Sequence, residues 1–245
     1  MKEYSTEAIR NIALVSHSSA GKTMLTEAFL HFTGATTRLG KIEEGTTVSD
    51  SDDEEKRRGI SIYSAVVPVE YRDHKINFVD TPGYNEFIGE MISGLNISDC
   101  ALVVVDSVSG FEVGTEIAWQ YCDQFKLPRL LVVNKMDREN ANFQKALDSA
   151  ANYSSIRLIP VQLPWGEKAA FQGVIDLLTM KAYKGDGKTV TDIPADLKAD
   201  AEAAHMALVE AAAEGEDALL EKYLESGELS AEDLEEWQRI FGKEP

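Results

Sequence analysis

The sequence predicts an α/β fold built on a doubly wound, mostly parallel sheet, and three observations indicate it. Apolar runs that read as strands alternate with segments of helical periodicity, as in β-α-β units. Two of these runs, 101–105 and 130–133, are continuous and rich in β-branched residues, which is typical of parallel strands buried on both faces. Polar residues follow three of the runs, at the carboxyl ends where such sheets bind ligands.

The expected elements follow in order along the chain. The strands are residues 11–16, 61–71, 75–80, 100–106 and 129–134. The helices are residues 22–33, 84–96, 115–125 and 142–153. Only the short polar stretch 71–75 joins the second and third strands, so we expect these two strands to form a hairpin.

The composition excludes several classes of protein. The 245 residues carry a net charge of −18, which argues against a binder of duplex nucleic acid. No run approaches the about 20 apolar residues of a membrane span, and residues 1–10 lack an apolar signal core. Cys100 and Cys122 lie in apolar surroundings without metal-ligand spacing, as reduced structural cysteines do. We therefore expect a cytoplasmic protein without a membrane partner.

The negative charge is concentrated in the last part of the chain. Residues 191–245 hold 16 Asp and Glu against 4 Lys and Arg, a net charge of −12 and two-thirds of the total. Such a run is either a solvated helical face or a recognition surface for a protein partner. This shift in composition marks an organisational boundary in the chain.

A phosphate-binding motif follows the first strand. Residues 16–23 match G-x-x-x-x-G-K-[ST] except that Ser16 replaces the first glycine. In such a loop, backbone N–H groups converge on phosphate oxygens ahead of a helix N-terminus. The small residues that this geometry needs are Ser18, Ser19, Ala20 and Gly21. Lys22 is placed to reach the β- and γ-phosphates, and the Thr23 hydroxyl to bind Mg²⁺. The alternative is an ordinary strand-to-helix turn.

The third strand ends in Asp80-Thr-Pro-Gly83. A carboxylate at the end of a buried strand can hold Mg²⁺, directly or through water, opposite Thr23. Gly83 leaves a backbone N–H able to approach a γ-phosphate and lets the segment move when that phosphate leaves. The plainer interpretation is a Pro-Gly turn.

Asn134-Lys-Met-Asp137 follows the fifth strand. The Asp137 carboxylate can accept hydrogen bonds from both the N1–H and the 2-amino group of guanine, a pair of donors that adenine lacks. Asn134 can bond the base edge and brace the loop, while the stem of Lys135 can lie over the ring. Together with the two preceding motifs, this order predicts a guanine-nucleotide site.

The segment 33–59 is long, polar and mixed in charge, as functional loops often are. It leads into Arg58-Gly-Ile-Ser61, where the Ser61 hydroxyl can supply a second Mg²⁺ ligand when triphosphate is bound. We interpret this segment as a nucleotide-ordered switch, and the alternative is a disordered connector.

With these residues in place, the chain resembles the GTP-binding domain of the translational GTPases, and among them elongation factor G and its divergent elongation-factor-G-like paralogues. The matching motifs are residues 16–23, 57–61, 80–84 and 134–137. Residues 157–164 and 173–183 are similar to the start of the subdomain that elongation factor G inserts into its GTPase domain. The resemblance implies a P-loop GTPase core at residues 1–156 and an acidic α+β insertion subdomain at residues 157–245. It also implies GTP or GDP as ligand, Mg²⁺ as cofactor, and the ribosome and its stalk protein as partners.

The motifs and the resemblance together define the expected site. Its nucleotide-binding residues are Ser18, Ser19, Ala20, Gly21, Lys22, Thr23, Asp80, Asn134, Lys135 and Asp137. Its catalytic residues are Lys22, Gly83 and Tyr84, and its metal ligands are Thr23, Ser61 and Asp80.

Three departures from the family pattern bear on activity. Tyr84 stands where the family has the histidine implied to position the attacking water, and a tyrosine hydroxyl is a poor base at neutral pH. Ser19 replaces an aspartate and puts in doubt any monovalent-cation site that the aspartate supports. We also expect the sixth strand, the Ser-Ala guanine loop and the last helix of the family's domain to be absent, which leaves a sheet edge exposed or differently covered.

Three functions are therefore open. The first is Mg²⁺-dependent GTP binding and hydrolysis in an elongation-factor-G-like, ribosome-associated factor, with slow or no turnover by the isolated chain. The second is a nucleotide-sensing interaction module with negligible GTPase activity, which Tyr84 favours. The third is a fragment that binds no nucleotide.

Overall fold

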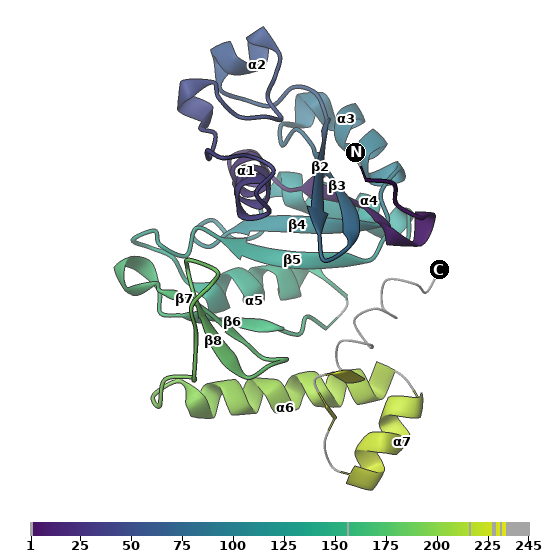
Figure 1. The fold of residues 1–245 in the computed structure, drawn as a ribbon, viewed down its shortest axis with the longest axis vertical. Helices are drawn as coiled ribbons and strands as arrows, with labels where there is room; N and C mark the ends of the chain where they lie inside the picture. Colours follow the sequence, from purple (N-terminus) through teal and green to yellow (C-terminus); the bar gives the residue numbers. More distant parts are fainter. Residues whose placement is uncertain (1, 156, 216, 227–228, 231, 234–245) are drawn as a thin grey trace. The chain divides into compact units, whose positions relative to one another are not determined.

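The structure is a computed structural model that describes residues 2–155, 157–215, 217–226, 229–230 and 232–233 (Figure 1). The chain divides into two compact units, Met1–Lys135 and Met136–Pro245. Helix α5 (Phe143–Tyr153) therefore groups with the second unit, whereas the sequence places it in the core. The domain boundary at residue 156 stays a prediction, and the last residues of the acidic run, 234–245, lie outside the described residues.

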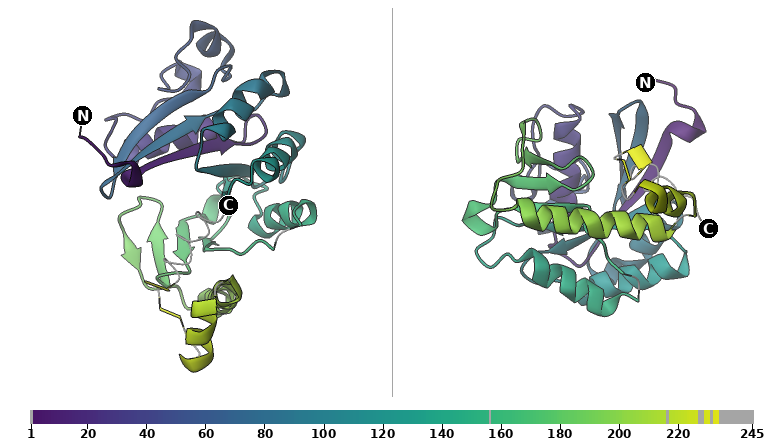
Figure 2. Two further views of the ribbon diagram at one scale, coloured as in Figure 1. Left: turned by 90° about the vertical axis from the view of Figure 1, so that its right-hand side faces the viewer. Right: turned by 90° about the horizontal axis from the view of Figure 1, so that it is seen from below.

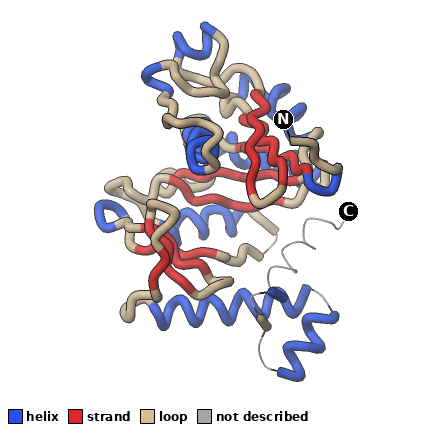
Figure 3. The backbone as a smooth tube through the Cα atoms, viewed as in Figure 1, coloured by secondary structure: helices blue, strands red, loops and turns tan. Residues whose placement is uncertain are grey.

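The first unit is built on a mixed, mostly parallel sheet, which confirms the predicted fold class. Its five strands have the order β2-β3-β1-β4-β5. They are β1 (Ile9–Val15), β2 (Ala65–Tyr71), β3 (His74–Asp80), β4 (Cys100–Asp106) and β5 (Arg129–Asn134). β1 runs parallel to β3 and β4, and β5 runs parallel to β4. β2 and β3 form the expected antiparallel hairpin (Figure 3). Tyr71 pairs with His74 beside its turn.

Helices cover both faces of this sheet. Adjacent side chains of a strand point to opposite faces. Phe78 of β3 stacks on Phe29 of α1 (Lys22–Phe32) with ring centroids 4.4 Å apart. The neighbouring Val79 lies against Gly94 of α3 (Ile88–Asn96) on the other face, because a Cβ atom at Gly94 would be 3.2 Å from Val79 Cγ1. The sheet is therefore doubly wound (Figure 2).

The helices after β3 begin differently from the prediction. The 3₁₀ turn η3 (Asn85–Phe87) precedes α3, so the helix expected over 84–96 is divided. The Phe87 N–H donates to the Tyr84 carbonyl oxygen at 3.0 Å and closes that turn. Helix α4 (Val113–Gln124) packs against α3 and β4 and begins two residues before the expected start. Another short 3₁₀ turn, η1 (Thr6–Ala8), precedes β1.

The two central apolar strands differ in burial. Residues 101–105 of β4 are all buried, as the continuous apolar run predicts. β5 was expected to be buried on both faces, but Leu130 is 57% exposed. The reason is position, because β5 is an edge strand of the sheet in the described part of the chain.

The second strand is shorter than the predicted 61–71, since it begins at Ala65. The backbone N–H groups of residues 62–64 do not pair with another strand. They donate instead to the carboxylates of Glu55 and Glu90, at 2.8 to 3.1 Å. Side-chain acceptors have therefore replaced the ladder at the start of this strand.

The segment 33–59 is folded rather than open. It contains η2 (Ile42–Glu44) and α2 (Asp53–Arg58). Helix α2 begins in a capping box between Asp52 and Glu55 and ends at Gly59, which has a left-handed backbone. The run of acids followed by bases places each charge at its favourable end of the helix.

The second unit combines α5 with an antiparallel sheet and two further helices. The sheet has the order β6-β7-β8-β9. The elements are β6 (Gln162–Trp165), η4 (Lys168–Ala170), β7 (Gly173–Asp176), β8 (Lys181–Lys184), β9 (Val190–Thr191), α6 (Lys198–Gly215) and α7 (Asp217–Ser226). Its core joins the sheet to α6 through Ile175, Leu177, Ala182 and Leu208. This is the α+β composition expected of the subdomain.

Neither unit offers a membrane span in its described residues, where no helix is both long and apolar enough to cross a bilayer.

Candidate functional site

Residues 16–21 carry the chain from β1 to α1 in the shape of an anion nest. Ser19 and Gly21 have left-handed backbones, with φ of 62° and 106°. Alternation of left- and right-handed residues turns successive N–H groups toward one side of a loop. A Cβ atom at Gly21 would overlap the Asn134 side-chain nitrogen, so this position requires glycine.

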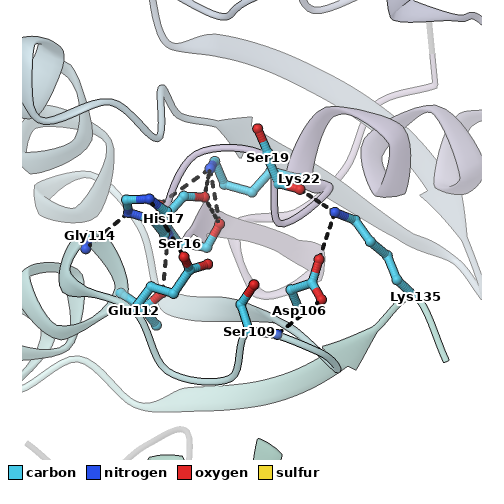
Figure 4. A network of polar contacts seen from close by, with 10 residues as sticks. Ser16, His17, Ser19, Lys22, Asp106, Ser109, Glu112, Gly114 and Lys135 are labelled. Carbon is cyan, nitrogen blue, oxygen red and sulfur yellow. Dashed lines mark hydrogen bonds and ion pairs between the residues drawn. The ribbon is translucent and has the colours of Figure 1, made fainter. Parts of the chain in front are cut away.

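Lys22 is the first residue of α1, and its side chain turns back over the loop (Figure 4). Its Nζ donates to Ser16 Oγ at 3.0 Å and to the His17 carbonyl oxygen at 3.2 Å. Burial lowers the pKa of Lys22 to about 8, against the raising effect of the Asp80 and Asp50 charges. A buried ammonium with neutral partners is poorly solvated, so an incoming anion stabilises it strongly. Lys22 is therefore suited to bind phosphate oxygens.

Gly83 lies against the same loop. A Cβ atom at Gly83 would lie 2.5 Å from Lys22 Nζ and 2.8 Å from the backbone nitrogen and Cα of Ser18. Only glycine permits this approach, and its N–H is placed to reach a phosphate held by the loop. The next residue, Tyr84, is 39% exposed.

A small pocket opens beside Gly83 and Tyr84. Ser16 of the loop contributes to its wall, and Ile88, Met91 and Ile117 of α3 and α4 supply apolar side chains. The pocket belongs to the candidate site, because the segment 82–85 lines it together with the loop.

The three side chains expected to bind Mg²⁺ lie around the start of α1. Thr23 Oγ1 and Ser61 Oγ are 3.2 Å apart. Asp80 is 1% exposed, and its Oδ2 accepts a hydrogen bond from Ser49 Oγ at 2.8 Å. Its Oδ1 is buried and has no hydrogen-bond partner among the described residues. A buried carboxylate oxygen without a donor is suited to a cation or to water held by one.

The electrostatics of Asp80 follow from this burial. Burial raises the pKa of Asp80 to about 6, while the hydrogen bond from Ser49 and the charge of Lys22 act in the opposite direction. A nearby divalent cation favours the ionised form of Asp80, so a bound ion would stabilise this buried carboxylate.

Sequence reasoning missed two residues of this cluster, Ser49 and Asp50. Asp50 is 4% exposed, and burial raises its pKa against a hydrogen bond from Ser61. Serine and aspartate are ordinary loop residues, so only the fold shows that both are buried beside Asp80.

The side-chain atoms that could bind a metal around the start of α1 are all oxygen atoms. In the part of the chain that the structure describes, no group of three or more His, Cys, Asp and Glu side chains could hold a metal. Two carboxylates and two hydroxyls suit Mg²⁺, which keeps several waters and takes phosphate oxygens as further ligands. The residues present therefore fit a magnesium–nucleotide complex rather than an all-protein metal cage.

Asn134, the last residue of β5, and the following Lys135 brace the loop. Asn134 Nδ2 donates to the Ala20 carbonyl oxygen at 3.0 Å. Lys135 Nζ donates to the Ser19 carbonyl oxygen and forms an ion pair with Asp106 at 2.9 Å. Burial would raise the pKa of Asp106, but the hydrogen bonds from Lys135 and a backbone amide outweigh it and lower the pKa. The bracing role of Asn134 is thus visible, whereas base contact stays a prediction.

Asp137 belongs to the second unit, and its base-reading role stays a prediction. Within that unit, the segment that carries it is held at two points. The Met136 carbonyl oxygen accepts the Lys168 N–H at 2.8 Å. The Phe143 N–H donates to Glu167 Oε1 at 3.0 Å, at the start of α5.

His17 anchors the loop on its other side, a contact that sequence reasoning also missed. Its Nδ1 accepts the Gly114 N–H at 3.2 Å, and the His17 backbone N–H donates to Thr115 Oγ1 at 3.1 Å. A Cβ atom at Gly114 would lie 2.7 Å from His17 Nδ1. Figure 4 shows this network, with Glu112 facing the imidazole ring. A glycine beside a threonine reads as an ordinary helix start, so the sequence held no clear signal.

The doubly wound sheet, the nest with its buried lysine, and the carboxylate at the end of β3 define a P-loop nucleotide-binding domain. The family model described as "Elongation factor Tu GTP binding domain" matches residues 7–231. This chain belongs to that family, and it is the G domain of a translational GTPase.

A solved structure shares the fold of this chain. The chain is similar to the crystal structure of ttk003000868 from Thermus thermophilus, with a TM-score of 0.85 and 37% sequence identity. The match covers 94% of this chain and 35% of that chain, so this chain spans about a third of the relative's length.

Proposed function

We propose that this chain is the Mg²⁺-dependent GTP-binding and GTP-hydrolysing domain of an elongation-factor-G-like factor that works on the ribosome. The observation that carries the proposal is the approach of Gly83 to Lys22 and to the Ser18 backbone. A triphosphate held by the loop would meet three elements there: a cation, an N–H donor and the oxygen cluster. Phosphoryl transfer needs little else, because its catalysis is mainly positioning and charge stabilisation.

In this proposal, each residue has a stated task. Lys22 donates to the β- and γ-phosphates, and the Gly83 N–H orients the γ-phosphate. Thr23 and Ser61 bind Mg²⁺, and Asp80 holds it directly or through water. When bound, the ion neutralises charge on the β- and γ-oxygens. Asp137 selects guanine, and the ribosome and its stalk protein are the partners, in the cytoplasm.

Tyr84 favours one alternative function. A tyrosine hydroxyl can hydrogen-bond the attacking water but is a poor base at neutral pH. The alternative is an interaction module that senses the nucleotide with negligible turnover and docks a protein through its acidic part. It predicts a stoichiometric GTP complex that is hydrolysed no faster with ribosomes than without them.

Removal of Mg²⁺ tests the proposal directly. We expect calorimetric titration to show saturable binding of GDP and of a non-hydrolysable GTP analogue. A chelator should lower the affinity for the analogue by about tenfold or more, because Thr23, Ser61 and Asp80 then lose the ion that links them to phosphate. Adenine nucleotides serve as the control. Absence of binding with Mg²⁺ present would contradict the proposal.

Asp137→Asn should change base preference. The asparagine amide can donate to the 2-oxo group of xanthine and accept its N1–H, whereas it loses both charge-assisted bonds to guanine. We expect the affinity for GDP to fall by about a hundredfold and that for the xanthine nucleotide to rise above it. Asp148→Asn, which changes an exposed carboxylate on α5, is the matched control. An unchanged preference for guanine would remove Asp137 from the base site.

A further inference from the structure

Two buried carboxylates, Glu27 and Glu55, lie behind the candidate magnesium site and belong to none of its expected ligands. Glu27 is 1% exposed and Glu55 is 2% exposed. In the described ranges, neither forms an ion pair with a lysine or arginine. A carboxylate without a cation is costly to bury, so backbone N–H donors must satisfy both.

Glu27 joins α1 to the segment that carries Asp50. It lies four residues after Thr23 and therefore on the same side of the helix. Its Oε1 accepts the Val48 N–H at 2.6 Å, and its Oε2 accepts the Gly40 N–H at 2.9 Å. A Cβ atom at Gly40 would overlap that Oε2 atom, so the chain passes as closely as a backbone can. Val48 directly precedes Ser49 and Asp50.

Glu55 holds the other side of the same cluster. Its Oε1 accepts the N–H groups of Ile62 and Tyr63 at 3.0 and 3.1 Å, directly after Ser61. Its Oε2 accepts the Asp52 N–H at 3.0 Å, two residues after Asp50. One carboxylate therefore ties both segments of the cluster together.

We propose that Glu27 and Glu55 are positioning residues for the magnesium–nucleotide site. They hold Asp50 and Ser61 against Thr23 and Asp80 through bonds to neighbouring backbone N–H groups, without touching the ion or the phosphates. The inference rests on the proposed function, because it assigns these two residues to the same site.

The contacts explain why this arrangement acts on affinity. Residues 60–64 form neither helix nor strand, so no regular ladder fixes Ser61. Each ordering bond to a carboxylate reduces the freedom that these residues lose when a ligand binds, which strengthens binding through preorganisation. The phosphate loop itself shares none of the bonds that Glu27 and Glu55 form in the described structure, so its own grip on the nucleotide is separate.

Glu27→Gln and Glu55→Gln test the proposal with little change of size. Glutamine has one acceptor oxygen, and its amide group faces a backbone N–H donor, so one anchoring side is lost. Glu44→Gln, an exposed residue of η2, is the control for Glu27. Glu54→Gln is the control for Glu55, because Glu54 is its neighbour in α2 and pairs with Arg57 and Arg58 at the surface.

The readouts are binding and hydrogen exchange rather than turnover. We expect each variant to reduce the Mg²⁺-dependent gain in affinity for a non-hydrolysable GTP analogue by about tenfold, with unchanged affinity in chelator. Amide exchange should quicken at residues 40 and 48 in Glu27→Gln and at residues 62 and 63 in Glu55→Gln. The two controls should change neither quantity.

The possible outcomes separate this inference from the proposed function. Faster exchange with an undiminished Mg²⁺ gain would overturn it, since the carboxylates would then be structural only. Equal losses of affinity with and without Mg²⁺ would also overturn it. If Glu27→Gln does not fold, Glu55→Gln carries the test alone and must lower the Mg²⁺ gain. A wild-type chain that binds no analogue would instead overturn the proposed function, and this inference with it.

Discussion

Lys22→Ala is expected to lower the affinity for GDP and for a GTP analogue by about a hundredfold or more, the largest effect of any single change in the loop. Lys22 Nζ donates to Ser16 Oγ and the His17 carbonyl oxygen, which are neutral groups. Its burial lowers its pKa to about 8, so the charged form is poorly solvated there. Phosphate oxygens would restore that solvation, and alanine forfeits the whole of this gain.

Calorimetric titration checks this result, and two controls make it interpretable. Lys145→Ala removes an exposed lysine from α5 and should leave nucleotide affinity unchanged. Thermal unfolding of Lys22→Ala shows whether the fold persists, since the change leaves Asp80 and Asp50 without the charge of this lysine. A folded Lys22→Ala variant that titrates like the wild type would exclude the loop from nucleotide binding.

The sequence predicted those elements whose signal is local. β4 and β5 have the predicted bounds, because a continuous β-branched run between polar residues strongly favours a strand. The phosphate loop is also local, since its glycine, lysine and threonine are consecutive. The predicted start of β2 was wrong, because N–H groups of residues 62–64 donate to the carboxylates of Glu55 and Glu90. Neither glutamate belongs to the apolar run from which the strand was predicted.

The residues that support the site escaped prediction for the same reason. Ser49 and Asp50 belong to the site because they lie beside Asp80, which is about thirty residues later in the chain. Glu27 left a usable signal, because Thr23, Glu27 and Leu30 recur at helical spacing and all three are buried. An acid on the apolar stripe of a helix needs a partner, and here the partner is backbone of the segment 33–59.

Gly83→Ala should weaken the binding of GTP while leaving the binding of GDP nearly unchanged. The new Cβ atom would lie 2.8 Å from the backbone nitrogen and Cα of Ser18, and 2.5 Å from Lys22 Nζ. The lysine tip can move aside, but the Ser18 backbone is part of the nest and cannot. The segment 82–84 must therefore retreat from the loop, and its N–H donor moves away from the γ-phosphate.

The expected result has two parts. Affinity for GDP should stay near that of the wild type, because GDP has no γ-phosphate. Ribosome-stimulated hydrolysis should fall by about 10²- to 10³-fold, the usual effect of losing one preorganised donor. Gly89→Ala is the matched control, since nothing lies within 4 Å of a Cβ atom there and alanine favours the helix α3.

The ratio of analogue to GDP affinity gives the sharper test of the two, because it does not require turnover. A lower ratio in Gly83→Ala and an unchanged ratio in Gly89→Ala would mean that the segment after β3 reads the γ-phosphate. Tyr84, the next residue, would then be placed beside the attacking water, and its weak basicity would set the rate. An unchanged ratio in both variants would separate this segment from the phosphate and favour the interaction module with negligible turnover.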